Sequence, residues 1–328
     1  MASSKLQRRV AFMNQKGGVG KTTTAVSLAA AYALAGRRTL LIDLDPQAHA
    51  SLHVGVDVGS LESSVYDALL EPANASKGVV NARENLDVLP STTDLAAAEL
   101  ELASLPDRHR RLEMVLDALA SREYEFVLLD CPPSLGLLTL NALTAAREVM
   151  IPMQAHFLAL QGVSKLLDTV RLVARSTNPR LRVTGVVLCA HDATTTHTRE
   201  VVADLESFFT AARTQECPWK FARVLRPAIR RNIKLAECPS FGQTVFEYAP
   251  SASGAEDYKA LAASMIREWD EALKSDALRS ETARGETARH ASGSAPQPAP
   301  QPSAETAAQP VVRVSRGDAG SVPASSVA

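Results

Sequence analysis

The chain has 328 residues, of which 46% are hydrophobic and 22% charged, and its formal net charge is −1. This composition is typical of a globular protein, and the length is enough for one large core with residues left over. A net charge this close to zero excludes a global field that would attract nucleic acid or membrane, so any such attraction must come from a local patch. The four cysteines show no CxxC or Cys/His spacing, which indicates a reducing compartment and disfavours a structural zinc or iron–sulfur site.

No apolar run reaches the roughly 18 residues that a membrane-spanning helix needs. The basic start of the chain is followed by a glycine-rich loop and not by the apolar segment of a signal peptide. We therefore expect a cytoplasmic protein with no membrane partner.

Short apolar runs alternate with amphipathic segments over residues 1–274. The expected strands are 10–13, 39–45, 86–90, 126–130, 149–153 and 183–190. Each is a continuous apolar run, which is typical of parallel strands buried on both faces. The expected helices include 23–36, 108–121, 160–176 and, as the last core helix, 261–280. This alternation predicts an α/β fold: a doubly wound, mostly parallel sheet with helices on both faces.

The composition changes after about residue 275. The tetrad Glu-Thr-Ala-Arg occurs twice in 281–290, and 291–310 consists mostly of Ala, Pro, Ser and Gln. Such a segment cannot bury enough apolar surface to offset the entropy of ordering. We predict one domain over 1–274 and a disordered tail over 275–328, which is either passive or a tether for a partner.

The stretch 13-MNQKGGVGKTTT-24 follows the first expected strand and opens the first expected helix. A glycine loop in this position aims backbone N–H groups at one point, where the helix N-terminus adds partial positive charge. Lys21 is placed to reach the β- and γ-phosphates of a nucleotide, and the Thr22 hydroxyl to reach Mg²⁺. The expected cofactor-binding residues of the loop are Gly17, Gly18, Val19, Gly20, Lys21, Thr22 and Thr23.

The expected strand 126–130 ends in Asp130, which suits the carboxylate that holds Mg²⁺ through water. Thr22 and Asp130 together form the expected metal site. The loop departs from the commonest phosphate-binding pattern, because Gln15 stands where the first glycine belongs and a second lysine, Lys16, occupies the gap.

This pattern resembles the deviant Walker A motif of the ParA/MinD ATPases, and the resemblance covers nearly all of residues 8–270. It implies a P-loop ATPase with ATP and Mg²⁺ as cofactors that forms a homodimer in its ATP state. Lys16 would then reach across the dimer to the partner's phosphates, and a cation supplied in trans is worth about 10³–10⁵ in rate in other NTPases. The segment 40-LLIDLDPQAHAS-51 is similar to a second family signature, in which Asp45 would position the attacking water. The resemblance thus implies three catalytic residues: Lys16, Lys21 and Asp45.

The block 230–258 is similar to the Soj-like chromosome-partitioning branch of this family. The similarity implies that Asn232 helps to recognise adenine. The Pro-Arg-Asn that is common in the family is replaced here by Arg230-Arg231-Asn232.

A cluster of cations between Trp219 and Lys234 contains no acidic residue, and we call it the basic segment. Its members are Lys220, Arg223, Arg226, Arg230, Arg231 and Lys234. Such a segment suits phosphate binding without base readout, although a solvated face has the same composition. The resemblance to partitioning ATPases favours nonspecific binding of double-stranded DNA in the ATP state, and hence association with the nucleoid.

The expected function is therefore an ATPase that partitions or positions chromosome or plasmid DNA, with hydrolysis stimulated by a ParB-like or other partner. The alternative is the same switch acting on a protein cargo or as a division-site regulator. A scaffold that hardly hydrolyses ATP is disfavoured by the presence of Lys16 and Asp45. MinD-type membrane attachment is disfavoured because 261–280 suits a core helix. A metal-cluster role is disfavoured because Cys131 has no second cysteine in a comparable motif.

Overall fold

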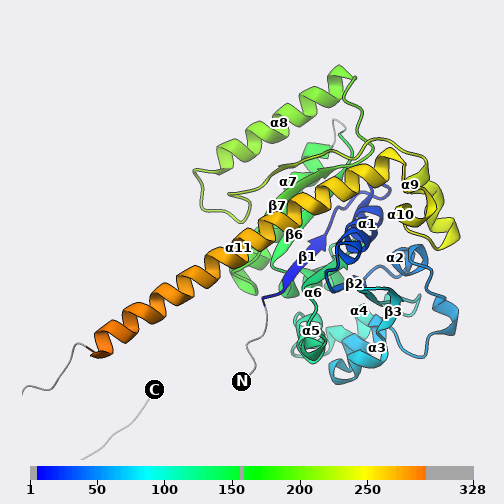
Figure 1. Cartoon of the computed structure of the whole chain (residues 1–328). Coiled ribbons are helices and arrows are strands. Elements are labelled where there is room, and N and C mark those ends of the chain that lie inside the picture. The colour runs from blue at the N-terminus through cyan, green and yellow to red at the C-terminus, as the bar shows by residue number, and fades with distance from the viewer. Residues whose placement is uncertain (1–5, 156–158, 293–328) are drawn as a thin grey trace, which may run out of the picture. The chain divides into compact units, whose positions relative to one another are not determined.

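The computed structural model describes residues 6–155 and 159–292 (Figure 1). The chain forms two compact units, one up to Asp276 and one from Ala277 onward. The first unit contains a sheet that, within the described residues, has eight strands in the order β3-β4-β2-β5-β1-β6-β7-β8. Neighbouring strands are parallel except for the antiparallel pair β3–β4. The expected α/β class, with a mostly parallel sheet, is confirmed.

The strands follow the predicted apolar runs closely, with two additions at the edges of the sheet. Their bounds are β1 Arg8–Phe12, β2 Thr39–Asp43, β3 Val80–Arg83, β4 Leu86–Leu89, β5 Phe126–Asp130, β6 Glu148–Met153, β7 Arg182–Leu188 and β8 Arg223–Leu225. The sequence did not predict β3 and β8, which are the two edge strands. Both are short and begin or end with an arginine, and edge strands commonly avoid long apolar runs.

Helices cover both faces of the sheet (Figure 1). The α-helices are α1 Lys21–Leu34, α2 His49–His53, α3 Val65–Leu70, α4 Leu95–Ala103, α5 Arg111–Ala118, α6 Leu137–Ala145, α7 Ala159–Ser176, α8 Thr196–Ala212, α9 Lys234–Glu237, α10 Val245–Tyr248 and α11 Ser253–Ser292. Four short 3₁₀ segments occur in the described chain: η1 Val58–Ser60, η2 Pro72–Lys77, η3 Ala120–Arg122 and η4 Cys238–Phe241.

Alternate side chains of each central strand enter different cores. In β1, Val10 and Phe12 pack in the cluster that also contains apolar residues of α1 and α11. Ala11, between them, packs in the cluster that contains residues of α3 to α8. Because both faces are covered, the strands need apolar residues at every position, which explains the continuous runs in the sequence.

Helix α11 crosses the predicted domain boundary at residue 274 and continues to Ser292. The part of the predicted tail that the structure describes, up to Ser292, is therefore helical in its backbone. Ala and Arg, which are frequent in this stretch, are strong helix formers. The rest of the tail, 293–328, lies outside the described residues. Among the described helices, none combines the length and apolar character needed to cross a membrane.

A charged pair is buried at the amino ends of β1 and β6. Arg8 and Glu148 are 4% and 3% exposed, and Arg8 donates two hydrogen bonds to the carboxylate at 3.1 and 2.9 Å. Arg8 also donates to the carbonyl of Met265 in α11 at 2.7 Å, and the Thr184 hydroxyl donates to Glu148 at 2.6 Å. Burial by itself would raise the pKa of Glu148, but Arg8 and the hydrogen bonds outweigh it and hold that pKa below its ordinary value.

We predict that Glu148→Ala lowers the free energy of unfolding by about 3 kcal/mol, because it leaves the Arg8 charge buried without its partner. Urea unfolding at pH 7 measures this. A depressed carboxylate pKa contributes stability above the unfolded-state pKa and loses it as pH falls, so the difference from wild type should shrink below about pH 4. Glu113→Ala, which removes a surface pair with Arg110, is the matched control and should change stability by less than about 1 kcal/mol. Equal effects of the two substitutions would contradict the assignment.

Candidate functional site

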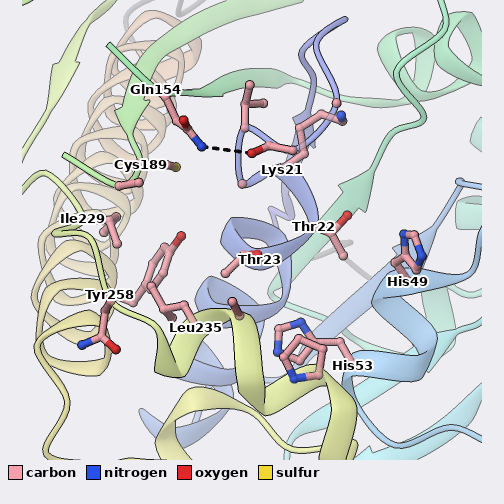
Figure 2. A pocket seen from close by; sticks show the side chains of 18 of the residues that line it. Lys21, Thr22, Thr23, His49, His53, Gln154, Cys189, Ile229, Leu235 and Tyr258 are labelled. Carbon is pink, nitrogen blue, oxygen red and sulfur yellow. Dashed lines mark hydrogen bonds between the residues drawn. The ribbon is translucent and has the colours of Figure 1, made fainter. Parts of the chain in front are cut away.

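A cavity of about 800 Å³ lies where the phosphate-binding loop meets the carboxyl ends of the central strands. In doubly wound sheets, ligands bind in this position. The loop residues Gly17 to Thr23 and Asp45 line one part of the cavity, and Asn232 lines another. Figure 2 shows Lys21 and Thr22 at the start of one helix, with Cys189, Ile229 and Tyr258 on one side of that helix and His49 on the other.

The loop is held in place by residues on both of its sides. The Asn14 side chain donates to the carbonyl of Pro152 at 2.9 Å and accepts from the backbone N–H of Lys16 at 3.1 Å. The Gln154 amide donates to the carbonyl of Gly18 at 3.0 Å (Figure 2). Gly20 begins helix α1 with a φ of 95°, a left-handed conformation that glycine adopts without strain. The first turn of α1 therefore presents its unpaired N–H groups to the cavity, as an anion-binding site requires.

The two lysines of the loop have different environments. Lys21 is buried, at 8% exposed, and its Nζ lies 3.4 Å from the carbonyl of Lys16, within the lining of the cavity. Lys16 is exposed and is not among the cavity-lining residues. Lys21 is thus placed to bind an anion in its own chain, whereas Lys16 is placed to reach something outside it.

Two carboxylates lie side by side at the ends of β2 and β5, where Asp43 pairs in register with Asp130. Both are fully buried. Asp43 accepts hydrogen bonds from the backbone N–H and hydroxyl of Ser51, at 2.9 and 2.8 Å, and from the N–H of Asp45 at 3.1 Å. Among the described residues, neither carboxylate oxygen of Asp130 has a hydrogen-bond partner. Burial raises the pKa of Asp130 well above its ordinary value, and the charge of Asp43 raises it further, against smaller opposing effects of Thr22 and Lys21.

A divalent cation fits this arrangement. A buried carboxylate without a partner is costly, and a bound cation supplies the missing opposite charge. In the described residues no group of three or more His, Cys, Asp or Glu side chains could hold a metal by itself. Mg²⁺ does not need such a group, since it is commonly bound by one or two carboxylates together with ligand phosphates and water. Thr22, which lines the cavity, and Asp130 are thus the residues suited to hold it.

Asp45 lies close enough to these two carboxylates for its charge to contribute to the raised pKa of each. It is half-buried and lines the cavity, and its Oδ1 accepts a hydrogen bond from the backbone N–H of Gln47 at 3.0 Å. The turn that follows β2 therefore fixes the direction of this carboxylate relative to the loop.

Asn232 lines the cavity together with its neighbours Arg230 and Arg231. Its amide nitrogen donates to the Ser253 hydroxyl at 2.8 Å, and its oxygen accepts from the N–H of Lys234 at 2.9 Å. An amide can make further hydrogen bonds with both groups. Recognition of adenine by Asn232 stays a prediction.

The basic segment does not form one free cationic surface. Five of its six members are paired with acidic side chains, two of them with near neighbours in sequence and three with residues of other helices. The pairs are Lys220 with Glu216, Arg223 with Glu268, Arg226 with Glu206, Arg230 with Glu256 and Asp257, and Lys234 with Glu237. Within the described residues Arg231 forms no ion pair; the pKa of Asp192 is lowered mainly by hydrogen bonds from Thr194, and the charge of Arg231 makes a smaller contribution.

The strength of these pairs is uneven. Asp257 is 7% exposed and accepts both the backbone N–H and the guanidinium of Arg230, at 2.8 to 3.1 Å, so this pair fixes the loop. The other four cations form exposed or half-exposed pairs, and such pairs contribute little stability. These cations can exchange their partner for a phosphate. DNA binding by the basic segment stays a prediction.

Several residues of the cavity were not predicted from the sequence. Gln154 and Cys189 come directly after β6 and β7, and their place at strand ends was a usable signal. Tyr258 reaches the cavity from α11, and its hydroxyl is 2.9 Å from the Thr24 hydroxyl in α1. His49 and His53 come from α2. Tyr258 and the two histidines carry no local motif, so only the folded chain reveals them.

Comparison with known proteins gives concordant results. Residues 7–183 match the family described as "AAA domain". The sporulation initiation inhibitor protein Soj of Bacillus subtilis is 43% identical over 77% of this chain and 96% of its own length. The chromosome-partitioning ATPase Soj of Thermus thermophilus is 43% identical over 81% of this chain and 98% of its own length. Among solved structures, cobyrinic acid a,c-diamide synthase from Mycobacterium smegmatis, with bound ADP and magnesium, is 37% identical with a TM-score of 0.67, over 81% of this chain and 96% of that one.

We predict that Asp130→Asn raises the free energy of unfolding by about 1 kcal/mol or more at pH 7 when Mg²⁺ is removed by a chelator. The raised pKa of Asp130 costs stability above the unfolded-state pKa of a carboxyl group, and an amide has no such cost. Asp43→Asn is the matched control. It replaces a carboxylate that accepts three hydrogen bonds, so it should lower the free energy of unfolding by about 1–3 kcal/mol. Denaturant unfolding of both variants in chelator measures this. Loss of stability in Asp130→Asn would contradict the assignment of an unpartnered carboxylate.

Proposed function

The chain belongs to the ParA/Soj family of chromosome-partitioning ATPases, and from this premise we propose that it is a partitioning ATPase whose ATP-bound dimer binds DNA without sequence preference. Its cofactors are ATP and Mg²⁺. A partner protein that stimulates hydrolysis then releases the dimer from DNA. The observation that supports the ATPase best is the buried Asp130 carboxylate, which has no hydrogen-bond partner by distance and angle in the described chain and lies close enough to Lys21 and Thr22 for both to lower its pKa.

The phosphates of ATP bind to the backbone N–H groups of the loop and to Lys21. Thr22 and Asp130 hold Mg²⁺, which supplies positive charge that neutralises the phosphates. Asp45 accepts a hydrogen bond from the attacking water and orients it toward the terminal phosphate. The burial of Lys21 and the half-buried position of Asp45 support these roles.

Lys16 acts on the nucleotide of the partner subunit. Its exposed position, outside the lining of its own cavity, supports this role. Phosphoryl transfer is accelerated by cations near the developing negative charge. A cation that arrives only with the second subunit therefore couples hydrolysis to dimerisation.

DNA binding follows from the difference between the two nucleotide states. ATP binds the dimeric form better than the monomer and shifts the population toward it. The dimer presents two copies of the basic segment, and the exposed Arg223 and Arg226 and the half-buried Lys220 and Lys234 exchange their acidic partners for DNA phosphates. The relatives named for chromosome partitioning support a DNA cargo. The same switch could act on a protein cargo, and the DNA experiment below separates the two.

We predict that Asp45→Ala binds ATP and forms the dimer but turns over at less than about 1% of the wild-type rate, since removal of a catalytic base or positioning group costs about 10²–10⁴. Phosphate release with ATP measures this turnover. Turnover at the wild-type rate would show that Asp45 does not orient the water.

We predict that Lys16→Ala binds ATP with unchanged affinity yet remains monomeric. Size-exclusion chromatography with ATP measures this. A stable dimer of Lys16→Ala would show that Lys16 does not act across the dimer.

We predict that the wild-type protein binds two unrelated DNA duplexes equally in ATP and weakly in ADP, and that binding falls as salt rises. The double variant Lys220→Glu/Arg226→Glu should lose at least about tenfold in DNA affinity, because each reversal replaces a phosphate contact with repulsion. Neither residue lines the cavity, so nucleotide affinity should be unchanged. Fluorescence anisotropy of labelled duplexes measures this. Equal DNA binding by wild type and variant would contradict the role of the basic segment.

A further inference from the structure

The cavity has a second wall, built from two short segments that are far apart in the chain. One is α2, with His49, Leu52 and His53, and the other runs from α9 into η4. The lining residues of that second segment are Leu235, Ala236, Pro239 and Ser240. Figure 2 shows His53 between the helix that carries His49 and the helix that carries Leu235. Neither segment belongs to the phosphate-binding loop, so the position of this wall depends on what joins them.

The two segments touch through glycines. Gly55 follows α2 and Gly242 follows η4, with φ values of 77° and 60°. A Cβ atom added to Gly55 would lie 2.8 Å from the carbonyl oxygen of Gly242, and one added to Gly242 would lie 2.9 Å from the Cα of Gly55. Both separations are too short for a real Cβ contact, so the approach needs glycine on each side.

One arginine from outside the cavity ties this crossing together. Arg83, at the end of edge strand β3, donates to the carbonyl of Val54 at 2.8 Å and to the carbonyl of Gly242 at 3.1 Å. Its Nε donates to the carboxylate of Glu247 in α10 at 2.7 Å. We call this set of contacts, together with the Gly55–Gly242 approach, the Arg83 clamp. A single planar guanidinium thus binds two backbone carbonyls and one carboxylate at once, and its donors are held in a fixed fork that the compact ammonium group of lysine lacks.

The side chains next to the Arg83 clamp pack in a way that also holds the wall in one position. His53 is buried, and its Nε2 lies 3.4 Å from Sγ of Cys238, the first residue of η4. Burial lowers the pKa of His53 to about 4, and the charge of Arg83 contributes to the shift. His53 therefore stays neutral at physiological pH and packs against Cys238 without adding charge to the wall.

We propose that Arg83 is a positioning residue for nucleotide binding, which acts through the wall and not through contact with the ligand. The inference depends on the proposed function, because it takes the ligand to be ATP. When the phosphates occupy the loop, the ribose and base extend into the remainder of the cavity. The wall that the Arg83 clamp holds together bounds part of that remainder. Without the clamp, the wall must be ordered when the nucleotide binds, and that cost weakens the affinity.

The proposal assigns the phosphates of the nucleotide to the loop and its ribose and base to the wall, and this difference allows a direct test. Inorganic tripolyphosphate carries the phosphates but no ribose or base, so it contacts the loop and not the wall. We expect Arg83→Gln to weaken the binding of Mg-ATP and Mg-ADP by about tenfold or more, which corresponds to about 1.4 kcal/mol. Its affinity for Mg-tripolyphosphate should change by less than about twofold. Isothermal titration calorimetry measures all three, and Arg110→Gln, which removes an exposed arginine paired only with Glu113, should behave as wild type.

Two further variants keep the proposal falsifiable if Arg83→Gln fails to fold. Gly55→Ala disturbs the same crossing without changing charge and should show the same selective loss. Arg83→Lys retains the charge but not the fork, so it should restore only part of the ATP affinity. Unchanged ATP binding in Arg83→Gln or Gly55→Ala would overturn the proposal, and so would an equal loss for ATP and tripolyphosphate. If the wild-type protein binds tripolyphosphate but not ATP or ADP, the proposed function fails instead, which is a distinct result.

Discussion

The site depends on one electrostatic constraint: two carboxylates are buried next to each other, and one of them has no partner in the described chain. Parallel pairing of β2 and β5 in register places Asp43 opposite Asp130. The backbone that follows β2 satisfies Asp43 through Ser51 and Asp45. Burial and the charge of Asp43 raise the pKa of Asp130 well above its ordinary value, and the Thr22 hydroxyl and the charge of Lys21 offset this only in part. A cation that arrives with the phosphates would supply the missing opposite charge, so the site suits Mg-ATP better than the nucleotide alone.

The same constraint accounts for the different burial of the two lysines of the loop. Lys21 is buried and lies where it opposes the charge of Asp130. Lys16 is exposed, and its backbone N–H is anchored by Asn14. Lys21 therefore contributes to the electrostatics of its own site. Under the proposed function, the exposed Lys16 acts on the nucleotide of a second subunit, and this coupling of hydrolysis to dimerisation is the physical basis that we propose for DNA capture and release.

The sequence predicted the parts of the fold and the site that are encoded locally. The continuous apolar runs located the six central strands, because those strands are covered by helices on both faces. The loop from Gly17 to Thr23 and the strand-end Asp130 were found from motif and context together. Edge strands β3 and β8 are too short to give such a signal. The wall could not be predicted for another reason: Arg83 and Gly242 are 159 residues apart in the chain and come into contact only in the folded structure. The basic segment shows the same limit, since its cations are visible in sequence but the acids that pair with them, such as Glu206 and Asp257, come from other elements.

The most direct test of this account is the equilibrium affinity of the wild-type protein for ATP, measured by calorimetry with Mg²⁺ and again with a chelator in its place. If the buried Asp130 charge is the governing constraint, removal of Mg²⁺ should weaken ATP binding by at least about 100-fold, because the phosphates then meet an uncompensated buried carboxylate. Equal affinity in both conditions would contradict the account, since it would show that Lys21 and the backbone N–H groups of the loop bind the phosphates without help from a cation at Asp130.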